Sequence, residues 1–205
     1  MSIKHFKINI NEPVDNWHDL LMNNNCINDF LLFENDRDRL IWFITNYTQY
    51  LIRNGGNEVV PLFGKAISNL ETFIYQVNLS LPVGYHLGTK LDALYDLLLN
   101  FETEPQGRFI IWNDSNHLFN NNKADFVNIF ESLIIAAYCN RNGISTIKED
   151  GTRYRVDQRN MFIFNDNKLE DIQGLLNKEY FIPSIDKQSQ SDRIIDFNLI
   201  ELTEE

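Results

Sequence analysis

The alternation of apolar and polar residues predicts a chain that mixes strands with helices. Residues 3–10 alternate at a period of two, which is typical of a half-buried strand. Residues 14–33 predict one or two short helices around an Asn-rich break. Residues 37–53 carry apolar side chains at helical spacing, and the glycine pair at Gly55 and Gly56 marks the end of that helix. The first 56 residues are therefore expected to be mostly helical.

From residue 57 the pattern changes to strands separated by helices. Residues 58–63 predict a strand in which Pro61 favours an edge or a bulge over a central position. A capping box from Ser68 to Glu71 opens a helix that runs to about Leu81. The later elements are expected to be a helix near 91–98, a strand at 108–112, a helix at 123–140 and a strand at 161–164. This order predicts parallel strands joined by right-handed crossovers.

The C-terminal residues predict further elements. Asp150-Gly151 lies between alternating runs and indicates a hairpin. Residues 169–180 are expected to be helical, residues 184–192 to form a polar loop, and residues 193–202 to form a terminal strand. The added strands are expected to extend the sheet at its edges.

The helix near 91–98 has an unusual charged side. Leu91, Leu94 and Leu98 fall on one face, while Asp92 and Asp96 fall on another at i and i+4. Two like charges at this spacing cost an isolated helix roughly 0.2 to 0.5 kcal/mol. Asp92 can be explained by its place in the first turn, where the helix dipole favours an acid, and Asp96 as a solvated residue. The other interpretation is a binding or reaction site.

The charge and composition narrow the function classes. A formal net charge of −11 argues against direct binding to nucleic acid and for a basic partner. No apolar run is long enough to span a bilayer, and the first residues lack the apolar core of a secretory signal, so we expect a cytoplasmic protein without a membrane partner. Cys26 and Cys139 have no partner at metal-ligand spacing and are expected to be free buried thiols.

The amino-acid sequence of one segment is similar to that of a known family. Gly88-Thr-Lys-Leu-Asp-Ala-Leu-Tyr-Asp96 follows Pro82 and a tyrosine-bearing loop, and precedes the strand Arg108-Phe-Ile-Ile-Trp112. This segment resembles the barstar family of intracellular ribonuclease inhibitors, and the resemblance extends over about residues 58–165. It implies a three-stranded parallel sheet and a plug, formed by the loop and the following helix, that enters the active site of a nuclease.

The resemblance also implies which residues bind the partner. They are Tyr85, His86, Gly88, Asp92, Tyr95, Asp96, Glu131 and Ser132. Asp92 and Asp96 correspond to the acidic plug residues, with Tyr95 as the aromatic residue between them. His86 takes the place of a family tyrosine, and Ser132, with Glu131 beside it, aligns with the family's acid on a later helix.

These observations predict an α/β protein with a barstar-like three-layer arrangement, a small parallel sheet and additional edge strands. Residues 1–56 are expected to pack on a main domain, residues 57–205, as one folded unit. The predicted function is a stoichiometric inhibitor, an immunity protein or antitoxin whose partner is a basic nuclease toxin. Six acidic and two basic residues lie between Glu58 and Glu104, so the carboxylates would stand in for RNA phosphates.

Two alternatives stay open at the level of sequence. The first is an enzyme in which Asp92 and Asp96 act on water or bind a metal ion, although no further ligands, phosphate loop or nucleophile motif are visible. His117 stands close only to Asp114 and Asn116, which suggests a turn. The second is a scaffold that binds a partner other than a nuclease. We expect no cofactor, no metal ion and no catalytic residue; the sequence leaves the oligomeric state undetermined.

Overall fold

The computed structural model describes residues 3–23, 28–54, 56–81, 88–99, 105–144, 151–152, 155–182 and 191–204. The strands are β1 (Ile3–Asn9), β2 (Asp29–Phe33), β3 (Asn57–Phe63), β4 (Gly107–Asn113), β5 (Asp157–Phe164), β6 (Glu179–Ile182), β7 (Ser191–Ile194) and β8 (Phe197–Thr203). The helices are α1 (Val14–Asn23), α2 (Arg37–Arg53), the 3₁₀ turn η1 (Gly64–Ala66), α3 (Leu70–Ser80), α4 (Leu91–Leu99), α5 (Ser115–Asn121), α6 (Lys123–Asn142) and α7 (Leu169–Leu176).

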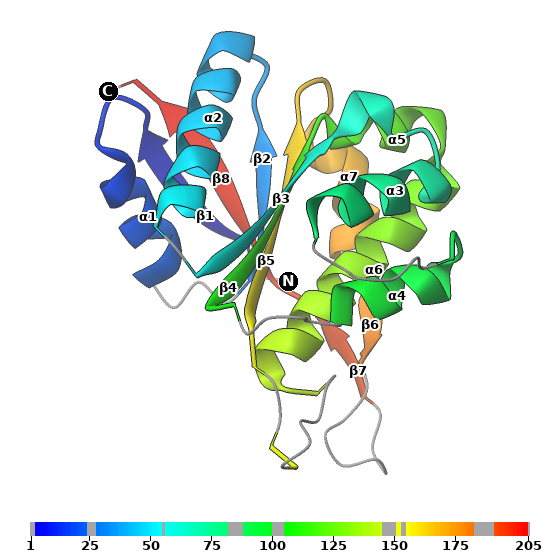
Figure 1. Cartoon of the computed structure of the whole chain (residues 1–205). Helices are drawn as coiled ribbons and strands as arrows, with labels where there is room; N and C mark the ends of the chain where they lie inside the picture. Colours follow the sequence, from blue (N-terminus) through cyan, green and yellow to red (C-terminus); the bar gives the residue numbers. More distant parts are fainter. Residues whose placement is uncertain are drawn as a thin grey trace.

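Six strands form one parallel sheet in the order β1-β8-β2-β5-β4-β3. Helices α1 and α2 cover one face, and α3 to α7 cover the other, so the molecule has three layers (Figure 1). Strands β6 and β7 pair antiparallel in a separate small sheet. The predicted α/β class with a three-layer arrangement is confirmed.

Alternate residues of each central strand point to opposite faces, which gives the sheet two cores. On β5, Met161 and Ile163 join the core beneath α1 and α2. Phe162 and Phe164 alternate with these residues along β5 and join the larger core beneath α3 to α7. Because both faces are covered by helices, these strands read as continuous apolar runs in the sequence.

The predicted barstar-like strands are neighbours in the sheet, in the order β3, β4, β5. Strand β3 lies at the edge, where the missing amide of Pro61 is tolerated. The other edge of that trio is not free, because β2 pairs with β5 and is followed by β8 and β1. The N-terminal and C-terminal additions therefore extend the sheet on the β5 side only.

Several sequence expectations were wrong in detail. Residues 29–33 form strand β2 instead of a helix; Phe30, Leu31 and Leu32 are all buried, and such a short apolar run has no period that separates strand from helix. The α3 cap is Asn69 paired with Thr72, and not Ser68 with Glu71.

The C-terminal region also differs from the expectation. Helix α7 ends at Leu176, and residues 179–182 form β6. The expected terminal strand is divided into β7 and β8. The expected hairpin at Asp150-Gly151 and the polar loop at 184–192 lie mostly outside the described residues.

Candidate functional site

The predicted plug helix, α4, is amphipathic as expected. Ala93, Leu94, Leu97 and Leu98 are buried in the larger core. Asp92 and Asp96 are exposed on the opposite side. Figure 1 shows α4 in the outer layer beside α3 and α6. The two carboxylates are therefore held on a solvent-facing surface by a helix whose other side is fixed in the core.

Buried polar groups tie the C-terminal end of α4 to the sheet. The Leu98 carbonyl accepts hydrogen bonds from Arg108 Nη1 at 2.8 Å and Asn140 Nδ2 at 3.0 Å. Arg108 on β4 is only 2% exposed and forms an ion pair with Glu58 on β3, with an Nη2 to Oε2 distance of 2.7 Å. Burial lowers the pKa of the Arg108 guanidinium, and the Glu58 carboxylate opposes that shift. This network sets the position of α4 relative to β3 and β4.

Tyr95 lies between the two acids in sequence and packs against α6. Burial raises the pKa of the Tyr95 phenol, and a hydrogen bond between the Tyr95 and Ser132 side chains works against that rise. Ser132 is 1% exposed and donates to the Asn128 carbonyl at 2.7 Å. In this conformation Ser132 supports Tyr95 and presents no surface to a partner.

Glu131 reaches the surface but is already paired. Its Oε1 lies 2.5 Å from Lys178 Nζ, which follows helix α7. Gly88 is exposed, and a Cβ atom there would meet only the Ala93 side chain at an ordinary contact distance of 3.8 Å. Tyr85 and His86 lie outside the described residues.

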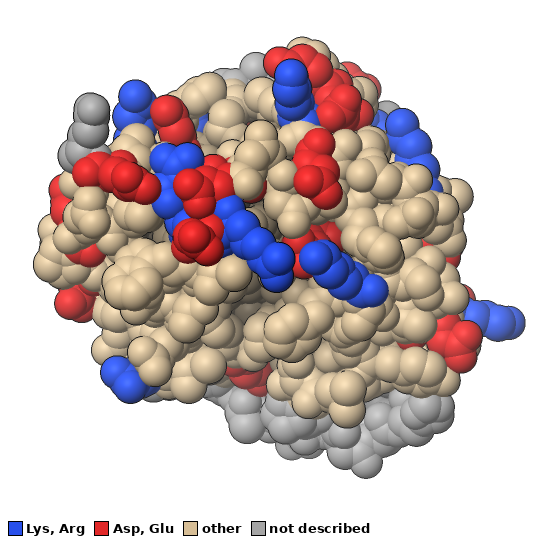
Figure 2. Space-filling model, turned by 90° about the horizontal axis from the view of Figure 1, so that it is seen from above, with Lys and Arg blue, Asp and Glu red and all other residues tan. Residues whose placement is uncertain are grey.

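A second feature, absent from the sequence expectations, is a pocket of about 350 Å³ at the carboxyl ends of the strands. It is lined by Asn35, Arg37, Leu40, Ile41, Ile44, Lys65, Asn113, Asp114, Asn116, His117, Asn165 and Asp166. We call it the carboxyl-edge pocket. Figure 2 looks onto this edge and shows Lys, Arg, Asp and Glu side chains close together near the middle of the face.

The sequence contained one signal for this pocket. Buried strands β2, β4 and β5 are each followed directly by a short run of polar residues, and parallel strands bring their carboxyl ends to the same edge. His117, Asp114 and Asn116 do form a turn, with the His117 amide donating to the Asp114 carbonyl at 2.9 Å. That turn forms part of the pocket wall.

Within the described ranges, no three His, Cys, Asp or Glu side chains are grouped so that they could hold a metal ion. None of the described helices is long and apolar enough to cross a membrane. Cys139 is a free buried thiol whose pKa is raised to about 11 by burial, so it is not a reactive thiolate.

The fold has counterparts among solved structures. The Aeropyrum pernix ORC2 protein in its ADPNP-ADP complexes has a TM-score of 0.53 and 14% identity, over 92% of this chain and 46% of that chain. The ADP form of the same protein has a TM-score of 0.50 and 14% identity, with the same coverage of both chains. This chain thus spans less than half of the length of ORC2, and the likeness concerns the fold alone.

A comparison with curated proteins found no match. The model of the Barstar (barnase inhibitor) family matches residues 57–149. The matched region contains β3, α3, α4, β4, α5 and α6, and it includes the exposed carboxylates of α4. Residues 57–149 of this chain are therefore similar to the barstar family.

Proposed function

We propose that this chain is a stoichiometric inhibitor of a ribonuclease, an immunity protein or antitoxin that acts on a basic nuclease toxin. The observation that carries the proposal is the family match over residues 57–149, a region that includes α4 with Asp92 and Asp96. Both side chains are exposed, and α4 is anchored by Arg108 and Asn140. The inhibitor therefore presents its charges on a preorganised surface.

The inhibitory chemistry is electrostatic and involves no bond making. A ribonuclease active site holds Arg, Lys and His groups that bind RNA phosphates. The carboxylates of Asp92 and Asp96 accept hydrogen bonds from the same groups and exclude the substrate. The net charge of −11 accelerates association with a basic cleft by long-range attraction.

A nucleotide-hydrolysing enzyme is the alternative raised by the likeness to ORC2, whose structures contain ADPNP and ADP. Phosphate-binding loops use glycines and free amides at a helix N-terminus. Here the segment between β2 and α2 contains no glycine. Asp36 accepts from the Asp38 and Arg39 amides, and Glu34 accepts from the Asp36 amide at 2.7 Å. These amides are occupied by the chain's own carboxylates, which favours the inhibitor.

The test is inhibition of RNA cleavage. The chain is titrated against barnase and against any basic nuclease that is encoded beside its gene. Inhibition that is complete at one inhibitor per nuclease supports the proposal. If neither nuclease is inhibited or bound, the ribonuclease-inhibitor assignment is wrong.

Substitutions locate the inhibitory surface. Asp92→Asn and Asp96→Asn should each weaken binding by roughly 2 to 5 kcal/mol, a range that rests in part on the barnase–barstar complex itself. Glu170→Gln is the matched control, because Glu170 occupies the second position of α7 as Asp92 does in α4, and it is also exposed. Equal losses for the control and the α4 variants would show a general charge effect instead of a plug.

A further inference from the structure

The carboxyl-edge pocket lies where the chain connections diverge. From β2 the chain turns to α2 on one face of the sheet, and from the neighbouring strand β5 it turns to α7 on the other face (Figure 1). In open parallel sheets, ligands bind in the crevice that such opposite turns create at the carboxyl ends of the strands. The volume of about 350 Å³ is within the range of pockets for small molecules.

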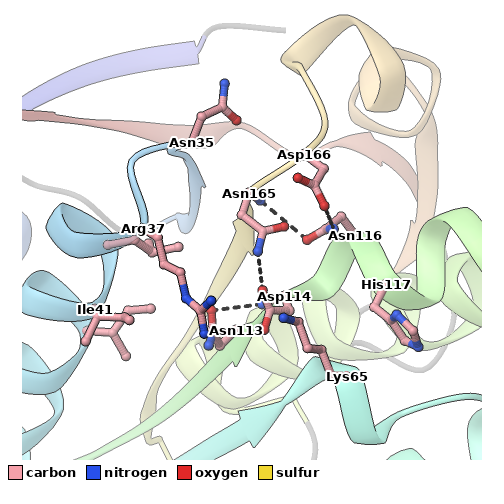
Figure 3. Close-up of a pocket in the computed structure, with 12 residues that line it drawn as sticks. Asn35, Arg37, Ile41, Lys65, Asn113, Asp114, Asn116, His117, Asn165 and Asp166 are labelled. Atoms are coloured by element: carbon pink, nitrogen blue, oxygen red, sulfur yellow. Dashed lines mark hydrogen bonds between the residues drawn. The ribbon is translucent and has the colours of Figure 1, made fainter.

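Two cationic side chains, Arg37 and Lys65, line this pocket and have no ion-pair partner among the described residues. Figure 3 shows Arg37 and Lys65 reaching toward Asp114 from opposite sides, one from α2 and one from η1. In the described part of the chain, neither side chain has an ion pair or a hydrogen bond. Ion pairs are formed instead by Lys7, Arg39, Arg108, Arg141, Arg159 and Lys178.

The position of Arg37 is also electrostatically unfavourable. It is the first residue of α2, where the positive end of the helix dipole disfavours a cation. Asp114 and Asp166 also line the pocket, but neither forms an ion pair with Arg37 or Lys65 in the described part of the chain. The two unpaired cations therefore point to an anionic ligand group.

The pocket acids are held by neighbouring amides. Asn165 Nδ2 donates to Asp114 Oδ1, and Asn116 Nδ2 donates to Asp166 Oδ2 at 3.2 Å. The remaining oxygen of the Asn165 carboxamide is buried and has no hydrogen-bond partner. A buried acceptor without a donor is costly, so this atom provides a place for a donor from the ligand.

The walls of the pocket are rigid. Asp114 adopts a left-handed conformation with φ of 49°, which is uncommon for a residue other than glycine. Gly64 in η1 packs so closely on the Asn113 and Asp114 carbonyls that a Cβ atom would collide with them. Ser115 Oγ donates to the Ile163 carbonyl at 2.7 Å and ties this turn to β5. The pocket is therefore formed before any ligand binds.

The α2 side of the pocket is apolar. Leu40, Ile41 and Ile44 line it, and Ile41 is 50% exposed. We propose that the carboxyl-edge pocket binds a small organic anion whose phosphate or carboxylate group lies between Arg37 and Lys65. A hydroxyl or amino group of this ligand donates to Asn165 Oδ1, and its carbon skeleton rests on Ile41 and Ile44. The α4 carboxylates are not part of this site.

The test uses two probes, glycerol 3-phosphate and malate, at constant ionic strength. Each combines an anionic group with a hydroxyl donor. Binding is followed by the side-chain amide NMR signals of Asn165 and Asn116 in ¹⁵N-labelled protein. We expect a saturable shift of these signals with one probe or both. A response to one probe alone identifies the group as phosphate or carboxylate, and a response to both shows that the pocket accepts either.

Substitutions distinguish the pocket from general charge effects. Arg37→Ala and Lys65→Ala should each weaken binding about tenfold or more, as expected for a lost charge-assisted hydrogen bond. Arg53→Ala, at the other end of α2 and also exposed, should bind like the wild type. Thermal unfolding checks that the variants remain folded. Asn165 signals that do not saturate with either probe, or equal weakening by Arg53→Ala, would overturn the proposal.

Discussion

Arg108 is the residue whose removal should most clearly disconnect the plug helix from the sheet. Its guanidinium is 2% exposed, bonds Glu58 through Nε and Nη2, and donates through Nη1 to the Leu98 carbonyl at the end of α4. The substitution Arg108→Met keeps most of the side-chain volume and removes the charge. It removes the ion pair with Glu58 on β3, while Leu98 keeps its bond from Asn140.

The expected cost follows from this arrangement. Removing one partner of a buried ion pair costs about 3 to 5 kcal/mol, because the other charge is left uncompensated. The Glu58 side chain keeps 12% exposure, so water can reach it and the lower end of this range applies. For a chain of this size, a loss of about 3 kcal/mol corresponds to a fall in Tm of roughly 6 to 12 °C.

Chemical denaturation of four proteins tests the reasoning: wild type, Arg108→Met, Glu58→Met and the double variant. The double variant should recover most of the stability that either single variant loses, since two apolar side chains replace a buried pair at little net cost. A single variant that loses less than about 1 kcal/mol would show that the pair is effectively solvated. A double variant no more stable than Arg108→Met would show that the bond to Leu98, and not the pair, carries the stability.

Two further predictions concern single acids. Asp96→Asn should leave the free energy of unfolding unchanged or raise it by roughly 0.2 to 0.5 kcal/mol, because it removes the repulsion with Asp92 on α4; a clear loss in a thermal melt would mean that Asp96 has a structural partner. Burial raises the pKa of Asp29 above its usual value, although Arg141 opposes the shift. The folded state thus favours the protonated form of Asp29. The contribution of this protonated form to the free energy of unfolding is present at low pH and is lost as pH rises through the pKa of Asp29 in the folded state. Asp29→Asn should therefore be more harmful at pH 4 than at pH 7 in denaturant titrations, and the opposite trend would show that Arg141 dominates.

The elements that could be predicted from sequence are those with a clear period or a clear end. Helix α2 has apolar residues at helical spacing, and its predicted range is the observed one. Helix α4 shows its buried and exposed sides directly in its leucines and acids. Strand β2 was missed because it is buried on both faces, and its apolar run of four residues after Asp29 carries no alternation.

The position of added strands and pockets depends on contacts between distant residues. The local pattern of apolar and polar residues does not show that β8 lies between β1 and β2. That order depends on how segments far apart in the sequence pack together. The carboxyl-edge pocket combines residues from η1, α2, α5 and the ends of β4 and β5. The same limit applies to Glu131, whose partner Lys178 lies 47 positions away. Ser132 lies in α6, within the range predicted to be helical, but its burial depends on how α4 and α6 pack.

Residues 1–56 and residues 57–205 contribute strands to the same sheet. Residues 57–205 without the first 56 residues should not form a stable monomer. Among the described strands, β8 pairs only with β1 and β2, so the deletion removes both of these neighbours. It also removes β2 from β5, which leaves the apolar stretch Met161 to Phe164 as an open edge, and it uncovers the sheet face beneath α1 and α2.

An open apolar strand edge is a template for association with other chains. We therefore expect the fragment 57–205 to aggregate or to elute as large species in size-exclusion chromatography, with loss of the near-UV circular dichroism of the intact chain. Supplying residues 1–56 as a separate peptide should restore part of that signal, because the peptide carries the missing strands β1 and β2. A fragment that is monomeric and unfolds as cooperatively as the full chain would show that residues 57–205 fold independently and that residues 1–56 are an addition to them.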